Sequence, residues 1–117
     1  MKTYTVKKVV HFCYAHRLVG HPHCDALHGH NGVATIEATA EHLHGPWGFV
    51  IDFGELKSLV KVYDHSGEIV FVSAEVLAAQ VGQEVRRILR EREQAPLKVK
   101  VTIEETPGSE ATWEWTA

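Results

Sequence analysis

The residues with the clearest chemical potential in this chain are two histidines, His28 and His30, separated by a single glycine. In an extended segment, residues two apart point to the same face, so the two imidazoles lie side by side like neighbouring ligands of a metal ion. A third histidine, His16, lies upstream. Three neutral nitrogen ligands that leave a fourth position open are typical of a catalytic zinc site, although iron or another divalent metal fits the same ligands. The three histidines therefore predict a metal centre of the catalytic kind.

Two further groups could act beside such a metal. Cys24 lies in a polar loop between His16 and His28, which is a poor position for a small buried hydrophobic residue. A nearby cation would lower the pKa of its thiol and favour the nucleophilic thiolate. Asp64 and His65 are adjacent, and a carboxylate beside an imidazole can orient the ring and raise its basicity, although the pair also fits a polar helix end. The other histidines are expected to be ordinary surface or packing residues: His11, His21, His23, His42 and His44.

Two predicted strands position the three histidines. Residues 4–15 alternate loosely and are rich in β-branched and aromatic types, which is typical of a strand that ends near His16. Three side chains share one face of that strand: Phe12, Tyr14 and His16. Residues 31–41 alternate again, with apolar side chains at the even positions. His28 and His30 continue this even parity, so we expect both imidazoles on the apolar, inward face of the second strand.

The rest of the chain predicts two helices followed by two strands. The helices begin after the N-cap residues Asp52 and Ser73 and carry apolar side chains at helical spacing. The expected elements are strand 4–15, strand 31–41, helix 53–63, a helix from Ser73 to about 93, strand 97–103 and strand 110–116. We predict an α+β fold of order ββααββ, with an antiparallel four-stranded sheet and two helices on one face, in one domain over residues 1–117.

A carboxylate at the end of the third long strand is a candidate binding group. Glu105 shares the face of Val99 and Ile103, whereas Glu104 lies on the opposite face. An inward carboxylate needs a hydrogen-bonding partner, and the paired N–H groups of a ligand can be that partner. Glu105 is therefore expected to bind a ligand.

The composition excludes several functional classes. The chain has 117 residues, 44% apolar residues and a net charge of −3, which gives no reason to expect nucleic acid or an acidic membrane surface as a partner. It contains no apolar run of membrane-spanning length and no signal-peptide pattern. The two cysteines are then expected to be reduced thiols in a cytoplasmic protein.

Several blocks of the chain together resemble the 6-pyruvoyl-tetrahydropterin synthase family, which includes bacterial 6-carboxytetrahydropterin synthase. The blocks occupy residues 12–18, 24–31, 48–57, 64–65, 73–75 and 104–106. The Cys-x3-His-Gly-His block is specific, whereas Asp-His and Glu-Thr alone are weak signals. One departure is Gly32, because an aromatic residue usually follows His-Gly-His-Asn in this family.

The resemblance implies three groups of site residues. The zinc ligands would be His16, His28 and His30. The catalytic residues would be the thiol of Cys24 and the pair Asp64 and His65. The substrate contacts would be Glu105, which anchors the pterin ring, and Ser73.

The resemblance also implies a fold, an assembly and a reaction. The fold is the ββααββ tunnelling fold, whose subunits assemble into homo-oligomers, commonly hexamers built from trimers. The expected reaction is the zinc-dependent conversion of 7,8-dihydroneopterin triphosphate to 6-carboxytetrahydropterin, which leads toward queuosine-type deazapurines. The nearest alternative is 6-pyruvoyl-tetrahydropterin synthase, which eliminates triphosphate from the same substrate and keeps its side chain. Two other hypotheses are a non-catalytic relative that binds metal or pterin, motivated by the short segment 64–73, and a histidine-rich metal-buffering protein.

Overall fold

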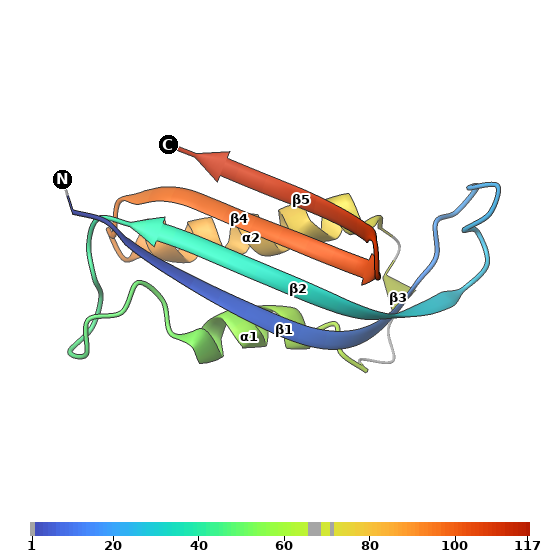
Figure 1. Cartoon of the computed structure of the whole chain (residues 1–117), viewed down its shortest axis with the longest axis horizontal. Coiled ribbons are helices and arrows are strands. Elements are labelled where there is room, and N and C mark those ends of the chain that lie inside the picture. Colours follow the sequence, from blue (N-terminus) through green and yellow to red (C-terminus); the bar gives the residue numbers. More distant parts are fainter. Residues whose placement is uncertain (1, 66–68, 71) are drawn as a thin grey trace.

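The chain folds as one sheet with both α-helices on one side of it (Figure 1). The computed structural model describes residues 2–65, 69–70 and 72–117. The elements are β1 Tyr4–His16, β2 His28–Ala40, α1 Phe53–Lys61, β3 Ile69–Val70, α2 Ala74–Glu91, β4 Pro96–Thr106 and β5 Ser109–Thr116. The short segment 64–73, noted from the sequence, falls partly on residues 66–68 and 71, which lie outside the described residues.

The sheet has the order β3-β1-β2-β4-β5. Its four long strands pair antiparallel with their neighbours, which confirms the predicted α+β fold and the predicted order of the long strands and helices. The two-residue strand β3 was not predicted. It pairs in parallel with the end of β1, where its two residues lie opposite Ala15 and His16.

The core lies between the sheet and the helices, and strand alternation builds it. The even residues of β2 from Ala34 to Ala40 are fully buried, and so are the odd residues of β4 from Val99 to Ile103. The helices contribute Leu56 from α1 and several apolar side chains of α2. The sheet therefore has one apolar face against the helices and one polar face away from them.

The predicted N-caps begin both helices. The side chain of Asp52 accepts a hydrogen bond from the backbone N–H of Gly54 at 2.7 Å, and that of Ser73 accepts one from Val76 at 3.2 Å. An ion pair between Glu55 and Arg92 then joins the start of α1 to the C-cap residue of α2. No helix in the described ranges is both long and apolar enough to cross a membrane.

The outer edge of β1 is unpaired along most of its length within the described residues. The N–H and C=O of Cys13 point away from β2, because they bond to the side chain of Asp64 and to the backbone of His65. Backbone groups alternate between the two edges of an antiparallel strand, so those of Thr5 and Val9 also point outward. The N–H of Ala117, an odd residue just after β5, bonds to the carbonyl of Leu97 in β4. By the same alternation, the even residues of β5 direct their backbone groups to the other, outer edge of the sheet.

Candidate metal centre

The sheet register brings three imidazoles together at the end of β1. His16 lies directly opposite His28 across the β1–β2 ladder, and His30 lies opposite Tyr14. One ring nitrogen from each of His16, His28 and His30 falls in a group whose members all lie within 4.8 Å of one another. The side chain of His16 is only 2% exposed. The even parity of β2 thus places both of its histidines on the helix-covered face, as the sequence pattern predicts.

Backbone carbonyls set the tautomers of two of these rings. The Nδ1 of His16 lies 3.1 Å from the carbonyl of Val72, and the Nδ1 of His28 lies 2.8 Å from the carbonyl of Ala26. A carbonyl only accepts hydrogen bonds, so each Nδ1 carries a proton, which leaves Nε2 as the ring nitrogen that can bind a ligand. The Nε2 atoms of His16 and His30 lie only 3.0 Å apart. A cation between these nitrogens would satisfy both, so the donor set fits zinc.

The protonation state of His30 also suits a metal ligand. Burial lowers the pKa of His30, the carboxylate of Glu105 partly offsets that shift, and the neighbouring His16 and His28 lower the pKa further. The ring is therefore neutral at neutral pH. Only a neutral imidazole has a lone pair to offer a metal.

A carboxylate and a phenol complete the surroundings of the three histidines. Glu105 Oε1 lies 3.5 Å from His16 Nε2 and 3.9 Å from His30 Nε2. The hydroxyl of Tyr14 donates to the same oxygen at 3.5 Å. Burial, followed by the charge of Glu105, raises the pKa of Tyr14, so the phenol keeps its proton and remains a donor.

Glu105 lies at a β-bulge in β4. Glu104 pairs with Glu110 and Thr106 pairs with Ser109, so β4 carries one extra residue between these pairs, and that residue is Glu105. Bulges re-aim a side chain locally and often lie next to functional sites. The inward direction of Glu105 follows from strand parity, whereas the bulge had no recognisable signal in the sequence.

Gly32, where the family pattern usually has an aromatic residue, lies beneath two aromatic rings of β1. The rings of Phe12 and Tyr14 are stacked, with centroids 4.9 Å apart. A Cβ atom on Gly32 would lie 3.0 Å from Tyr14 Cε1 and 3.1 Å from Phe12 Cε1. The rings of β1 therefore fill the space of the missing side chain on β2. Tyr14 was overlooked as a site residue, although its shared face with His16 was the available signal.

Cys24 and Ser73 are not part of the histidine group within the described residues. Cys24 lies in the loop between β1 and β2, where its N–H donates to His21 Nδ1 at 3.0 Å and its carbonyl accepts from Leu18 at 2.9 Å. His21, expected to be an ordinary residue, thus shapes this loop. Ser73 is the N-cap of α2 and follows Val72, whose carbonyl bonds to the Nδ1 of His16. The roles of Cys24 and Ser73 in catalysis and substrate binding remain predictions.

Asp64 and His65 lie together, on the outer edge of β1. The Oδ1 of Asp64 lies 3.0 Å from His65 Nδ1 and accepts from the N–H of Cys13 at 2.7 Å, and its Oδ2 accepts from Lys61 Nζ at 3.1 Å. The hydrogen bond from Cys13, followed by that from Lys61, lowers the pKa of Asp64 to about 2. Cys13 points to the face opposite Tyr14 and His16, so β1 lies between this pair and the three histidines. Their proton-transfer role remains a prediction.

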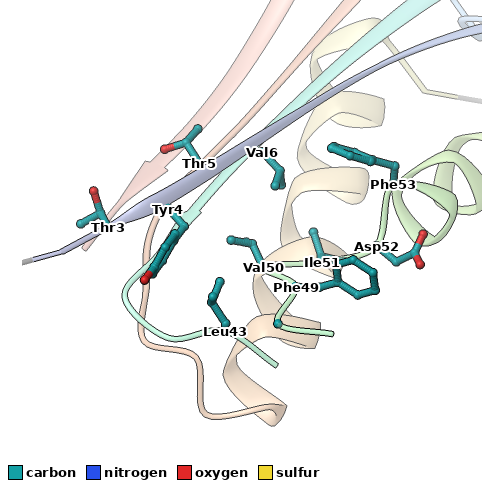
Figure 2. A pocket seen from close by; sticks show the side chains of 11 residues that line it. Thr3, Tyr4, Thr5, Val6, Leu43, Phe49, Val50, Ile51, Asp52 and Phe53 are labelled. Carbon is teal, nitrogen blue, oxygen red and sulfur yellow. The ribbon is translucent and has the colours of Figure 1, made fainter. Parts of the chain in front are cut away.

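A large apolar pocket lies elsewhere in the molecule (Figure 2). It has a volume of about 800 Å³ and is lined mainly by the start of β1 and by residues 48–53, with Tyr4, Leu43 and Phe49 among its walls. A strand as long as β1 spans roughly 40 Å, and the histidines lie at its far end. This pocket is therefore separate from the candidate metal centre.

Comparison with known families identifies the chain. The family model described as 6-pyruvoyl tetrahydropterin synthase matches residues 5–115, which is nearly the whole chain. The chain belongs to this family. Membership supports a pterin lyase activity in general terms. No curated protein sequence matches the chain significantly.

Solved structures of 6-pyruvoyl tetrahydropterin synthases share the fold. The protein from Caenorhabditis elegans is 24% identical with a TM-score of 0.69, and the match covers 99% of this chain and 98% of that one. The Plasmodium falciparum protein is 15% identical with a TM-score of 0.70, and a Plasmodium vivax catalytic-residue mutant is 19% identical with a TM-score of 0.68. Both of these matches cover 100% of each chain. At these identities the likeness establishes the tunnelling fold alone.

Proposed function

We propose that this family member is a zinc-dependent 6-carboxytetrahydropterin synthase that acts on 7,8-dihydroneopterin triphosphate, in a route toward queuosine-type deazapurines. The observation that carries the proposal is the group of three imidazoles beside an inward carboxylate. His16, His28 and His30 would hold the zinc. The metal supplies Lewis acidity, which polarises oxygen groups of the substrate side chain and makes adjacent C–H bonds more acidic.

The other residues of the site bind the substrate and move protons. Glu105 offers carboxylate oxygens to the paired N–H groups of a pterin ring, while Tyr14 donates to one of those oxygens and holds its orientation. Cys24 acts as a base on one face of the substrate, and His65, oriented by Asp64, serves the other face. Ser73 contacts the substrate at the start of α2. Since β1 separates Asp64 and His65 from the histidines of their own chain, we propose that this pair serves the site of a neighbouring copy.

Product analysis tests the reaction. The purified protein, loaded with zinc, is incubated with 7,8-dihydroneopterin triphosphate and the pterins are separated and identified. Release of acetaldehyde with a 6-carboxy product supports the proposal. A retained pyruvoyl side chain would instead assign the chain to the alternative, 6-pyruvoyl-tetrahydropterin synthase, and no turnover would contradict both.

Two variants separate this enzyme from the non-catalytic hypotheses. Cys24→Ala should abolish turnover while leaving zinc content unchanged, so activity that survives the change would exclude the role given to Cys24. His28→Ala should remove the zinc held at this centre, measured by elemental analysis. A metal-buffering protein would instead bind several ions through its scattered histidines and would lose little with His28→Ala.

We further propose that residues 1–117 form one domain that acts in the cytoplasm as a homo-oligomer, with hexamers built from trimers as the expected form. The proposal is supported by the two edges of the sheet, β5 and most of β1, which are unpaired among the described residues, and by the apolar pocket beside the start of β1 (Figure 2). Val9→Pro is a sharp test, because the N–H of Val9 points outward and its loss costs no bond to another described residue. Light scattering should show a smaller particle with intact circular dichroism. An unchanged mass would contradict edge pairing along β1.

A further inference from the structure

A row of alternating charges crosses the polar face of the sheet. Lys7 of β1 lies opposite Glu37 of β2. Glu37 lies opposite Lys100 of β4, which in turn lies opposite Glu114 of β5. Opposite charges that face each other across a ladder attract, so the row stabilises the sheet within one copy. The row runs straight across the four long strands, so the strands are not staggered along it.

The two edges of the sheet carry opposite charges on this face. The free stretch of β1, residues 5–9, carries Lys7 and no acidic residue, whereas the polar face of β5 carries Glu110 and Glu114 and no basic residue. Glu110 lies directly opposite Glu104, and like charges so placed repel each other. The ion pair of Glu114 with Lys98 leaves both Lys7 and Glu110 without an ion-pair partner among the described residues. Each edge therefore lacks the charge that the other edge offers.

The strand directions allow these two edges to meet between copies. Neighbouring long strands are antiparallel throughout, so β5 runs antiparallel to β1. A copy added by rotation therefore joins its β1 to the preceding β5 as a regular antiparallel pair, and repetition closes a ring. Pairing of β1 with β1, centred on the free stretch, would instead set Lys7 opposite Lys7 of the second copy. The charges thus favour a junction of unlike edges.

Closure of a ring sets the register at that junction. A sheet closes only when its strands are staggered, and a stagger of about one residue per strand tilts them by about 36°. Four long strands per copy then need a stagger of about four residues per copy, whatever the number of copies. Since the charge row within one copy is straight, the stagger falls at the junction. A shift of about four residues from Glu114 sets Glu110 opposite Lys7.

A shift in the other direction is blocked. It would carry the neighbouring β5 along β1 as far as His11 and Cys13. The carbonyl of His11 already accepts a hydrogen bond from Lys61, and both outward backbone groups of Cys13 are bonded to residues 64–65. Only the shift toward the start of β1 leaves free backbone groups for pairing.

The apolar side chains agree with the same register. On the helix-covered face it sets Ala111 of the next copy opposite Val6, and Trp113 of the next copy opposite Tyr4. Tyr4 is 42% exposed and Trp113 is only partly buried in one copy, so the junction would cover apolar surface on both sides. Val6 and Tyr4 also line the apolar pocket, which the neighbouring strand would partly cover (Figure 2).

We propose that β1 of one copy pairs antiparallel with β5 of the next copy, in the register that sets Lys7 opposite Glu110. The inference rests on the proposed homo-oligomer and not on its reaction. It assigns a surface and a partner to residues that lie far from the candidate metal centre: the partner is a second copy of this chain, selected by charge and by the stagger of a closed sheet.

Cysteine pairs at two alternative registers test the junction. Thr5 faces Thr112 of the next copy in the proposed register and Thr116 in an unstaggered one. Thr5→Cys combined with Thr112→Cys should form reducible cross-links between copies on oxidation, because opposite Cα atoms about 5.5 Å apart suit a disulfide. Thr5→Cys combined with Thr116→Cys is the matched control, with Cα atoms more than about 13 Å apart in the proposed register. The single variants report any cross-linking through the native cysteines.

Light scattering on the same proteins separates two kinds of failure. A monomeric unaltered chain would contradict the homo-oligomer and the junction together. An oligomer in which the Thr5–Thr112 pair does not cross-link, or in which only the control pair does, overturns the proposed register and leaves the homo-oligomer and its reaction standing.

Charge reversal tests the ion pair itself. Lys7→Glu sets two glutamates against each other across the junction and should shift the particle to a smaller mass, while Glu110→Lys in the same chain should restore the mass. Lys100→Glu makes the same change of charge inside one copy and should leave the mass unchanged, with circular dichroism verifying each fold. If Glu110→Lys does not restore the mass, or if Lys100→Glu reduces it equally, Lys7 and Glu110 do not face each other.

Discussion

Gly82 of α2 packs directly against the indole ring of Trp113 in β5. A Cβ atom added to Gly82 would lie 2.2 Å from Cε3 and 2.3 Å from Cζ3 of the indole ring, far inside ordinary carbon contact. Two effects of Gly82→Ala therefore oppose each other. Alanine inside a helix is about 1 kcal/mol more favourable than glycine, whereas overpacking a core costs typically about 1–3 kcal/mol.

The geometry decides which effect is larger. The overlap exceeds 1 Å, and it falls on a planar ring that packs against the buried core and cannot fold aside as a flexible chain end can. The cost should then lie near the upper end of that range, so Gly82→Ala should lower the free energy of unfolding by about 2 kcal/mol. Urea unfolding followed by circular dichroism, at one fixed protein concentration, measures this change as a lower midpoint with an unchanged slope.

A second background makes the reasoning refutable. Trp113→Leu removes the ring atoms that a Cβ at Gly82 would meet, so only the helix-propensity effect remains. In that background Gly82→Ala should stabilise the protein by up to about 1 kcal/mol. If the substitution stabilises the unaltered chain, or has the same sign in both backgrounds, then Trp113 is not what requires a glycine at residue 82.

Three further predictions concern polar groups. Gln94 is 1% exposed and its Nε2 donates to the carbonyl of Val50 at 2.7 Å. Gln94→Met keeps the side-chain volume but removes the donor, so it should lower the free energy of unfolding in urea by about 1–3 kcal/mol. A loss below about 0.5 kcal/mol, no larger than that expected for a surface substitution, would contradict a structural role for this bond. The pKa of Asp64 is lowered to about 2, so its contribution to stability is complete above the ordinary carboxyl pKa and is lost as the pH falls toward 2. Asp64→Asn should therefore flatten the fall in melting temperature between pH 4 and pH 2. Parallel curves of melting temperature against pH for the two proteins would disprove this role of Asp64. Glu55→Gln breaks the partly exposed ion pair with Arg92 and should lower the free energy of unfolding by less than about 1 kcal/mol, with a smaller effect at high salt. A loss of stability that does not depend on salt would show that the two residues act through packing.

The parts of the fold that follow from local pattern could be predicted from sequence. Alternation assigned His16, His28 and His30 to one face of two neighbouring strands, and the structure places their nitrogens together. The N-caps at Asp52 and Ser73 were equally local signals, since a capping side chain bonds within its own first turn. Patterns of this kind depend only on chain periodicity and short-range hydrogen bonds.

Features that depend on register between distant segments could not be predicted in this way. The contact of Tyr14 with Glu105 joins residues 91 positions apart and depends on the order of the strands, and it lies at a bulge that the sequence does not reveal. The bond between Cys13 and Asp64 joins residues 51 positions apart and depends on the path of a turn. Strand β3 is only two residues long, too short for any alternation to be recognised.

The attachment of the Asp64–His65 turn to Cys13 also limits how another strand can add to this sheet. The turn occupies both outward backbone groups of Cys13, and Lys61 Nζ occupies the outward carbonyl of His11 at 2.9 Å. An added strand can therefore pair with β1 only along its first half, from about Thr5 to Val9. The turn therefore limits how far along β1 a neighbouring chain can pair, and it keeps the backbone of that chain away from the strand segment that carries His16.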